Sequence, residues 1–289
     1  MTIAPSPLPA PNRRPVFGAS FRLGRTVVAL VVIALVVAAA FLAPWIAPFD
    51  PLNGNGALRL LPPGTEGHIL GLDAQGRDVL SRLLWGARPS LVAGIAPVAM
   101  ALAISLVLGL FAGYAPSFLG RCIMRFIDAL FAFPMILFAI ATVSLLGPGL
   151  TTIIVTITIS LVPYMTRIVY GAVVGEIGKG YLETARLLGA SRSGILFKEL
   201  LPNVASPSIV YATTLIGPMI GFSSGLSFLG LGIQPPSADW GRMTVEGVEV
   251  SAQGAPHIVL AAGIAIIITS LAFNWLGSGL RDILDPQRD

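Results

Sequence analysis

Six long apolar runs restrict this chain to one class of fold. A helix needs about 20 apolar residues to cross the hydrocarbon core of a bilayer, and each run is close to that length or above it. Hydrophobic residues make up 55% of the 289 residues and charged residues only 11%, which is more apolar surface than a water-soluble protein can bury. We therefore expect an all-α membrane protein with six transmembrane helices and both termini on one side. The runs cover residues 26–47, 90–113, 123–146, 150–170, 204–231 and 256–278.

The N-terminal region combines a basic tail with the first apolar run. Residues 1–25 are rich in Pro, Ser and Ala and contain four arginines, so we expect a disordered tail. A cleaved signal peptide is an alternative for residues 26–47, because the run ends in small alanines. The run is long for a signal peptide and five more follow it, which favours a retained first transmembrane helix.

The distribution of Lys and Arg predicts which side of the membrane each loop occupies. With the N-terminus in the cytoplasm, thirteen of the 18 Lys and Arg residues fall on the cytoplasmic side. Cytoplasmic loops are enriched in these residues, so this orientation is favoured. It places residues 172–203 and the C-terminus, residues 280–289, in the cytoplasm and residues 48–89 outside. Within that outer segment residues 76–85 are amphipathic, and we expect a helix along the membrane surface.

Residues 181–203 form the longest polar stretch between two apolar runs. Its apolar residues first follow the spacing of one helix face and then stop at Gly189, which predicts a short helix and a turn. A second short helix is expected, capped by Ser191 and ended by Pro202, which lacks a backbone donor. Two short helices between membrane spans indicate a docking surface for a soluble partner. The first apolar face consists of Tyr181, Leu182, Ala185 and Leu188.

Glycines recur within two of the spans at four-residue spacing. This spacing is typical of helices whose backbones pack closely, and lining a conduit is the alternative role. Pro134, Pro163 and Pro218 also lie within spans and are expected to kink their helices. The glycines are Gly109 and Gly113 in the second span and Gly217, Gly221 and Gly225 in the fifth.

Two catalytic sequence patterns occur, and each is incomplete. Residues 189–194 match the start of the phosphate-binding loop G-x-x-x-x-G-K-[ST], but Ile195 and Leu196 stand where the Lys and the hydroxyl are required. We therefore do not expect this chain to hydrolyse nucleotide by that route. Residues 221–225 read G-x-S-x-G, which would suit an intramembrane serine protease with Ser223 as nucleophile. That pattern needs a strand-to-helix turn, whereas this segment is predicted to be helical.

A self-contained channel or secondary carrier is a further alternative. Ion-coupled carriers usually place ionisable groups in the middle of their spans, and the centres of these six runs have none. Asp128 lies near the cytoplasmic start of its span, where Arg125 could pair with it, and Arg167 is also close to a cytoplasmic end. A single cysteine and two distant histidines argue against a disulfide or a metal site. The residues thus provide no energy source within this chain.

Four motifs occur in the order found in one family of transporters. The central motif, similar to a cytoplasmic E-A-A…G…L-P signature, consists of Glu183, Thr184, Ala185, Gly189, Leu201 and Pro202. The other three motifs lie at residues 70–82, 226–236 and 279–286. Together they resemble the permease subunits of bacterial ATP-binding-cassette importers, within them the C-type subunits of the dipeptide, oligopeptide and nickel permease family.

The resemblance implies a type I importer transmembrane fold in the bacterial inner membrane, with a five-helix permease core at residues 90–279. A homologous permease would form the other half of the pathway, and two cytoplasmic ATPase subunits would bind ATP and Mg²⁺. An extracytoplasmic solute-binding protein would deliver a peptide or a similar small solute, such as glutathione or nickel. The chain itself would hold no cofactor and bind no nucleic acid.

The same resemblance implies roles for two regions of the chain. The helix from Glu183 to Gly189 would be the coupling helix, seated in a groove of an ATPase subunit, so that closure of the ATPase pair tilts the attached spans. The outer residues Arg77, Asp78 and Trp240 would face the solute-binding protein, unless their helices only complete the fold.

Several positions depart from the pattern of the family. Thr184 replaces the second alanine of the signature, and Glu199 stands where the signature has an apolar residue. Both are expected to adapt the chain to its own ATPase partner. Ser223 and Ser278 occupy positions where relatives often have acids, so a role for those acids in conduction does not transfer here. Leu72 replaces a common threonine of the outer motif.

Overall fold

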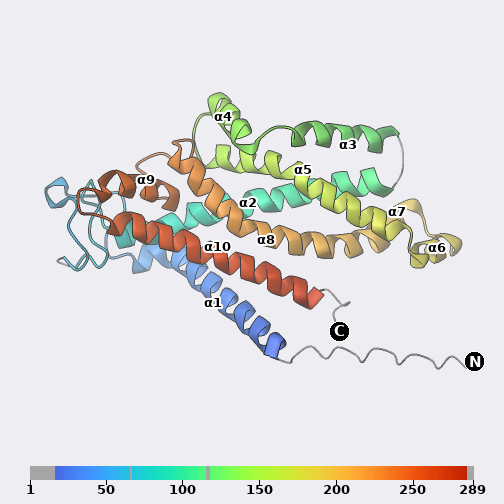
Figure 1. Cartoon of the computed structure of the whole chain (residues 1–289), viewed down its shortest axis with the longest axis horizontal. Helices are drawn as coiled ribbons and strands as arrows, with labels where there is room; N and C mark the ends of the chain where they lie inside the picture. The colour runs from blue at the N-terminus through green and yellow to red at the C-terminus, as the bar shows by residue number, and fades with distance from the viewer. Residues whose placement is uncertain (1–16, 66, 115–117, 285–289) are drawn as a thin grey trace, which may run out of the picture.

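The computed structural model describes residues 17–65, 67–114 and 118–284, and this part of the chain is an elongated bundle of helices without strands (Figure 1). Most of the predicted tail and the last five residues lie outside the described residues. The elements are α1 (Phe17–Ile46), the short turn η1 (Gly56–Leu58), α2 (Val79–Tyr114), α3 (Phe118–Phe131), α4 (Met135–Leu146), α5 (Leu150–Ile177), α6 (Gly180–Leu187), α7 (Arg192–Gly194), the π-helical turn η2 (Ile195–Leu200), α8 (Leu201–Phe228), α9 (Trp240–Ser251) and α10 (His257–Leu284).

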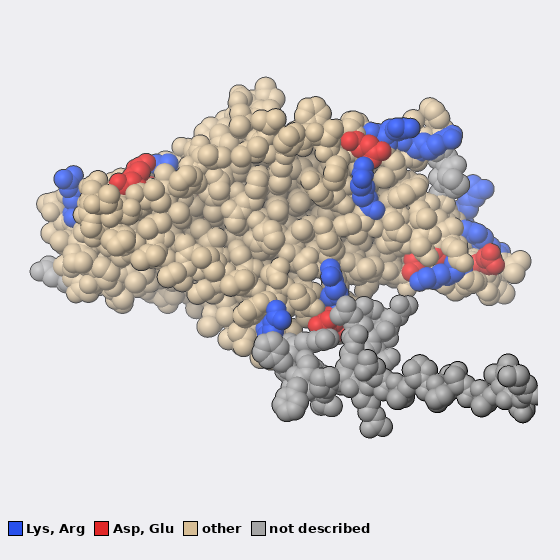
Figure 2. All heavy atoms as spheres, in the orientation of Figure 1, with Lys and Arg blue, Asp and Glu red and all other residues tan. Residues whose placement is uncertain are grey.

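Five helices of the described chain are long and apolar enough to cross a membrane, and a sixth span results if the bent pair α3 and α4 counts as one. This confirms the all-α membrane fold. α1 begins and α10 ends toward the same end of the bundle as α6, whereas η1, its flanking loops and α9 lie at the opposite end (Figure 1). We call these the α6 end and the α9 end. On the face that Figure 2 shows, charged side chains gather toward the two ends and leave an uncharged belt between them.

The third span, predicted over residues 123–146, is broken next to Pro134, where the sequence led us to expect a kink. α3 and α4 meet at an angle of 90°, and the break falls at residues 132–134. Pro134 has no backbone N–H with which to continue the helix toward the Leu130 carbonyl. Phe133 N–H donates to that carbonyl instead, at 3.2 Å, and closes the last turn of α3. Pro134 then precedes α4 in an extended conformation.

Two helix boundaries also differ from the sequence prediction. The amphipathic segment at residues 76–85 is not a separate surface helix, because its second part forms the first turns of α2. The Asp78 carboxylate caps this helix by accepting the Ser81 backbone N–H at 2.7 Å. α1 begins at Phe17, so the last residues of the predicted disordered tail are helical.

Three of the five predicted glycines lie where helices of this chain touch. A Cβ atom at Gly109 would lie 2.5 Å from Val169 Cγ1, and one at Gly113 would lie 2.6 Å from Val173 Cγ1, so both glycines let α2 approach α5. A Cβ atom at Gly217 in α8 would overlap the backbone of Ser270 in α10. Gly221 and Gly225, in contrast, have no described atom within 4 Å of that position.

Candidate functional site

The turn after α6 is built around Gly189. This residue has a φ of +82°, in the left-handed region that glycine adopts without strain. Ala190 N–H donates to Ala185 O and Gly189 N–H donates to Arg186 O, both at 3.0 Å. These two bonds form a Schellman motif, which satisfies the last carbonyls of a helix. The predicted end of the short helix at Gly189 is therefore confirmed.

The predicted apolar face of α6 is directed toward this chain and not toward a partner. Leu182 is completely buried, and Tyr181 and Ala185 are half-buried. The chain's own helices already cover Leu182, which leaves the exposed residues of α6 for contact with a partner. Its apolar neighbours come from α2, α5, η2 and α8, and they are Leu110, Val169, Val173, Ile195, Leu196, Leu200 and Val204.

The exposed side of α6 contains a different set of residues. Glu183 and Thr184 are exposed, and Leu187 and Leu188 at its C-terminal end are 88% and 83% exposed. α6 lies at the far end of the bundle, outside the candidate spans (Figure 1). Sequence periodicity singled out Leu188 but not Leu187, since Leu187 lies off the predicted face. The structure places both side by side with Gly189, which is also exposed.

A hydrogen-bonded clasp ties α6 to the helices on either side of it. Tyr181 Oη donates to Glu176 Oε2 at 2.9 Å and accepts from Asn203 Nδ2 at 3.3 Å. Lys179 Nζ lies 2.5 Å from the other oxygen of Glu176. Burial, together with the nearby Glu176 carboxylate, raises the pKa of Tyr181 to about 12, so its hydroxyl remains a donor at neutral pH. The clasp joins the end of α5, the start of α6 and the start of α8.

The second short helix does not end at Pro202, contrary to the sequence prediction. Ser191 caps it as expected, since its Oγ accepts the Gly194 N–H at 3.1 Å. The chain then continues through the π-helical turn η2 directly into α8, with Leu201 half-buried and Pro202 exposed near the start of that helix. A π turn leaves room for a proline without a break, because its hydrogen bonds span five residues instead of four. The polar stretch is thus rigidly joined to a membrane span.

The opposite end of the bundle contains a buried network of charges that the sequence did not predict. Arg82 Nη1 lies 2.5 Å from both Asp73 Oδ2 and Glu246 Oε2. Arg77 contacts the same two carboxylates, at 2.7 Å through Nε and 3.0 Å through Nη2, and all four residues are buried. Buried charges are tolerated when they are paired in this way. The network joins the loop before α2 to α9.

The three residues predicted to face a solute-binding protein are all buried at this α9 end. Arg77 belongs to the charge network, and Asp78 accepts from Ser81 and lies 2.9 Å from His68 Nδ1. Trp240 donates its indole N–H to Leu83 O at 2.9 Å. The fold uses the polar groups of these three side chains internally, which favours the alternative that their helices only complete the fold.

Beside Trp240, Asp239 fixes the start of α9 against α2. Its carboxylate accepts the Ser90 hydroxyl at 2.8 Å and the Arg242 backbone N–H at 3.1 Å. Burial raises the pKa of Asp239, and the hydrogen bond from Ser90 partly opposes this effect.

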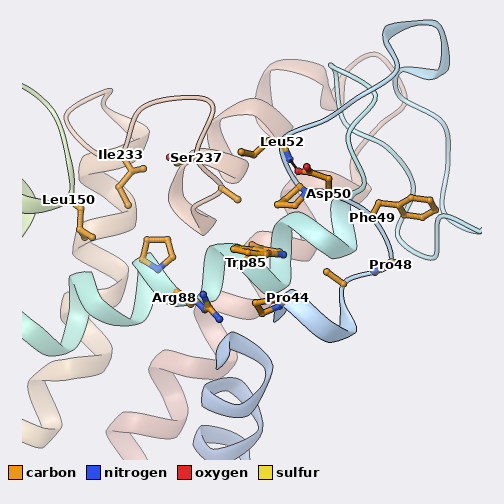
Figure 3. A pocket seen from close by; sticks show the side chains of 14 residues that line it. Pro44, Pro48, Phe49, Asp50, Leu52, Trp85, Arg88, Leu150, Ile233 and Ser237 are labelled. Atoms are coloured by element: carbon orange, nitrogen blue, oxygen red, sulfur yellow. Dashed lines mark hydrogen bonds between the residues drawn. The ribbon is translucent and has the colours of Figure 1, made fainter. Parts of the chain in front are cut away.

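An open pocket of about 820 Å³ lies at the α9 end, between α1, α2, the start of α5 and the loop before α9 (Figure 3). Its walls are mostly apolar, with Trp85, Leu150 and Ile233 among them. Arg88 at its edge donates through Nε to Ala40 O at 2.5 Å. Pro44 cannot pair with that carbonyl, so Arg88 replaces the missing helix donor. The pocket suits an apolar group, since most of its lining is apolar and the guanidinium of Arg88 is already engaged.

The protease pattern lacks the geometry that its chemistry needs. Residues 221–225 lie inside α8, and Ser223 Oγ donates to Ile220 O of its own helix at 2.9 Å. His257 lies with its Nε2 3.4 Å from Leu72 O, in a contact at the α9 end. Among the described residues, no group of three or more His, Cys, Asp and Glu side chains is arranged to hold a metal ion.

Two family profiles match this chain. The one described as "Binding-protein-dependent transport system inner membrane component" matches residues 105–289. The one described as "N-terminal TM domain of oligopeptide transport permease C" matches residues 25–63.

Individual relatives match along most of their length. The glutathione transport system permease protein GsiD of Pectobacterium atrosepticum is 43% identical over 88% of this chain and 84% of its own. The di/tripeptide transport system permease protein DppC of Pseudomonas aeruginosa is 40% identical over 88% of this chain and 85% of its own. A chain from an inward-facing structure of the MetNI methionine ABC transporter has a similar fold, with a TM-score of 0.57, 22% identity, and coverage of 71% of this chain and 97% of that one.

Proposed function

The chain belongs to the family of binding-protein-dependent transport system inner membrane components, and we propose that it forms half of the membrane pathway of an ATP-driven importer. It is a permease of the inner membrane, as its relatives are, and the family's transport depends on a binding protein. A second, homologous permease would complete the pathway.

The observation that carries the proposed coupling is the exposed apolar end of α6. Leu187 and Leu188 are almost fully exposed at the end of a helix that the rest of the chain anchors firmly. Neighbouring exposed leucines outside the lipid favour a protein contact. We assign this surface, with Glu183, Thr184 and Gly189, to an ATPase subunit. Its closure would displace α6, and the buried cluster around Leu182 would pass the motion to α5 and α8.

The energy for transport would come from two such ATPase subunits, which would bind ATP and Mg²⁺. Ile195 and Leu196 are buried in the cluster under α6, so the partial phosphate-binding pattern at residues 189–194 serves as a structural turn. This chain would then hold no cofactor of its own. The excess of Lys and Arg supports a cytoplasmic location for the α6 end, and the α9 end would face the solute-binding protein.

The substrate proposed for this permease is a small peptide. The relatives described above are named for transport of glutathione, which is itself a tripeptide, and of di- and tripeptides. Identification of the solute that the cognate binding protein retains, by mass spectrometry after purification, tests this choice.

The coupling surface is tested by replacing both exposed leucines with aspartate, Leu187→Asp and Leu188→Asp. Burying a leucine side chain contributes about 1.5–3 kcal/mol, so association with the ATPase should weaken at least about tenfold. The measurement is co-purification of ATPase subunits from membranes that contain equal amounts of each permease. Leu58→Asp, a partly exposed leucine at the α9 end, is the matched control and should leave the complex intact. Wild-type recovery of ATPase with the double variant would refute this docking surface.

Two further experiments address the alternatives. ATP-independent uptake by this chain alone in liposomes would indicate a self-contained carrier or channel and overturn the importer proposal. Ser223→Ala should leave ATP-driven uptake unchanged, whereas a protease acting through Ser223 would lose all activity.

A further inference from the structure

An ion pair lies on the surface of the bundle within the candidate spans. Arg167 Nη2 in α5 is 2.6 Å from Asp128 Oδ1 in α3, and the two side chains are 48% and 46% exposed. The sequence suggested Arg125 as the partner of Asp128, and the structure pairs it with Arg167 instead. The Arg167 guanidinium also lies 4.6 Å from the ring centre of Phe131, and Phe131 lies 4.4 Å from Tyr164.

The backbone next to this pair is also unsuited to lipid. Residues 132–134, which separate α3 from α4, are exposed and not helical. Non-helical backbone at membrane depth is tolerated only where protein buries it or where it lines a water-filled cavity. α3 has 14 residues and spans about 21 Å, so the break lies about that far along the bundle from the start of α3 at Phe118. Ionisable side chains within a span also tend to face the interior of a bundle or a water-filled cavity, and Asp128 and Arg167 both fall within candidate spans.

The exposed side chains of α1 and α10 differ in polarity from those around the ion pair. The exposed residues of α1 and α10 include Leu35, Ile264 and Ile267, all apolar, as lipid contact requires. On α5 the exposed face continues from Tyr164 to Arg167 and Gly171, at the spacing of one helix face. The ion pair and the broken backbone thus argue against lipid on this one face, and of the two remaining occupants, protein and water, the exposed ion pair favours water.

From these observations we infer that Asp128 and Arg167, with Tyr164 beside them, form a substrate-contacting site on the wall of the pathway, and that its ligand is a peptide with both ends charged. This inference rests on the importer function proposed above. The peptide carboxylate would bind the Arg167 guanidinium, and its ammonium group would bind the Asp128 carboxylate. When no peptide is present, the two side chains neutralise each other. Passage through a membrane requires a site that releases its ligand, and the ion pair that re-forms between Arg167 and Asp128 would compete with the peptide.

The first test measures whether this face is wet. In a Cys122→Ser background, Tyr164→Cys and Gly171→Cys are introduced separately into the complete, reconstituted complex and treated with a charged, membrane-impermeant thiol reagent. Gly171 has open space where a side chain would begin, so its variant should fold even if Tyr164→Cys does not. Both thiols should react at least about tenfold faster than Leu35→Cys, the lipid-facing control, because only a hydrated thiol ionises readily. Equal rates at Gly171→Cys and Leu35→Cys would overturn the inference.

The second test measures recognition of the peptide carboxylate. ATP-driven uptake of a dipeptide is compared with uptake of the same dipeptide amidated at its C-terminus, using one binding protein throughout. Arg167→Gln should reduce the preference for the free carboxylate by about tenfold, as expected for a lost hydrogen bond between charged groups. Arg59→Gln, at the distant α9 end, should leave the preference unchanged.

A charge-exchanged variant separates recognition from a purely structural role. Asp128→Arg combined with Arg167→Asp restores the ion pair with its polarity reversed. Recovery of wild-type preference in this double variant, or an unchanged preference in Arg167→Gln, would show that the pair only supports the fold. If the wild-type complex takes up no peptide in the presence of ATP, the importer function itself fails, which is a separate outcome.

Discussion

At the scale of single residues, the α9 end contains a network of four buried charges, whereas the charged residues of α6 are exposed. Arg82 is completely buried between the carboxylates of Asp73 and Glu246, whereas Glu183 is exposed. Sequence analysis could not find the pairing of Arg82 with Glu246, because 164 residues separate them and only the folded chain brings them together. Because the contact between Arg77 and Glu246 is also long-range, sequence analysis assigned Arg77 to the surface that faces a solute-binding protein.

Neutralising one member of this network should destabilise the fold. Glu246→Gln leaves Arg77 and Arg82 with a single shared carboxylate, and breaking a buried ion pair costs about 3 kcal/mol or more. Denaturant unfolding of the purified permease in detergent measures the loss. Glu249→Gln is the matched control, since Glu249 lies exposed on the same helix, and its effect should stay within about 0.5 kcal/mol. Similar unfolding free energies for the two variants would show that the network contributes little.

Gly189 provides a second prediction for a single residue. Gly189→Ala forces a Cβ atom into a left-handed conformation and should destabilise the turn after α6 by about 1 kcal/mol. Gly175→Ala, in α5, is the control and should be neutral or stabilising, because that glycine is helical with open space around it. The rate of hydrogen exchange at the Ala190 amide, which donates to Ala185, reports the effect. It should rise in the first variant only.

At the scale of elements, the position of α6 depends on its neighbours. The helix has eight residues, and isolated helices shorter than about 12–15 residues are marginal in water. Its apolar period correctly predicted a helix that ends at Gly189. The spacing of the apolar residues could not show which protein covers the apolar face of α6. Such a pattern identifies the side of a helix that is buried, but not the residues that bury it. The cover is this chain itself, and the partner surface that we propose instead lies at Leu187 and Leu188.

The clasp at Tyr181 should matter for coupling more than for assembly. Tyr181→Phe keeps the ring but loses the bonds to Glu176 and Asn203, a loss of about 1 kcal/mol. We expect the ATPase to bind normally while fewer peptides are transported per ATP. Simultaneous measurement of uptake and ATP hydrolysis in proteoliposomes gives that ratio, and an unchanged ratio would argue against a coupling role for the clasp.

The same variant has a defined pH dependence. Because the pKa of Tyr181 is raised to about 12, the stabilisation from its protonated hydroxyl is fully present below the usual tyrosine value and is lost as pH rises through 12. Between about pH 6 and 9 the difference between wild type and Tyr181→Phe should therefore stay constant. A difference that changes within this range would assign the effect to another group.

At the scale of the whole molecule, local patterns in the sequence predicted much of the fold. The features that depend on long-range contacts could not be predicted in this way. Apolar runs predicted the all-α membrane fold, because each span must satisfy its own backbone within the membrane. A kink at Pro134 was predicted, but a bend as sharp as the 90° between α3 and α4 was not, since average hydropathy does not respond to a break in the helix. The polar stretch was found through a local motif, whereas the site at Asp128 and Arg167 depends on two helices that meet only in the folded chain.

The predicted glycines give a final test at this scale, because they divide into two groups. Gly217→Leu should prevent folding, since any side chain there overlaps the backbone of α10. Gly221→Leu should fold and insert normally but lose the second permease, because paired glycines at four-residue spacing favour close helix contact and no part of the described chain uses them. Gly263→Leu, at an isolated open glycine of α10, is the control. The measurement is co-purification of each variant with a differently tagged second permease. If Gly221→Leu recovers as much of the second permease as wild type does, that partner lies on another face.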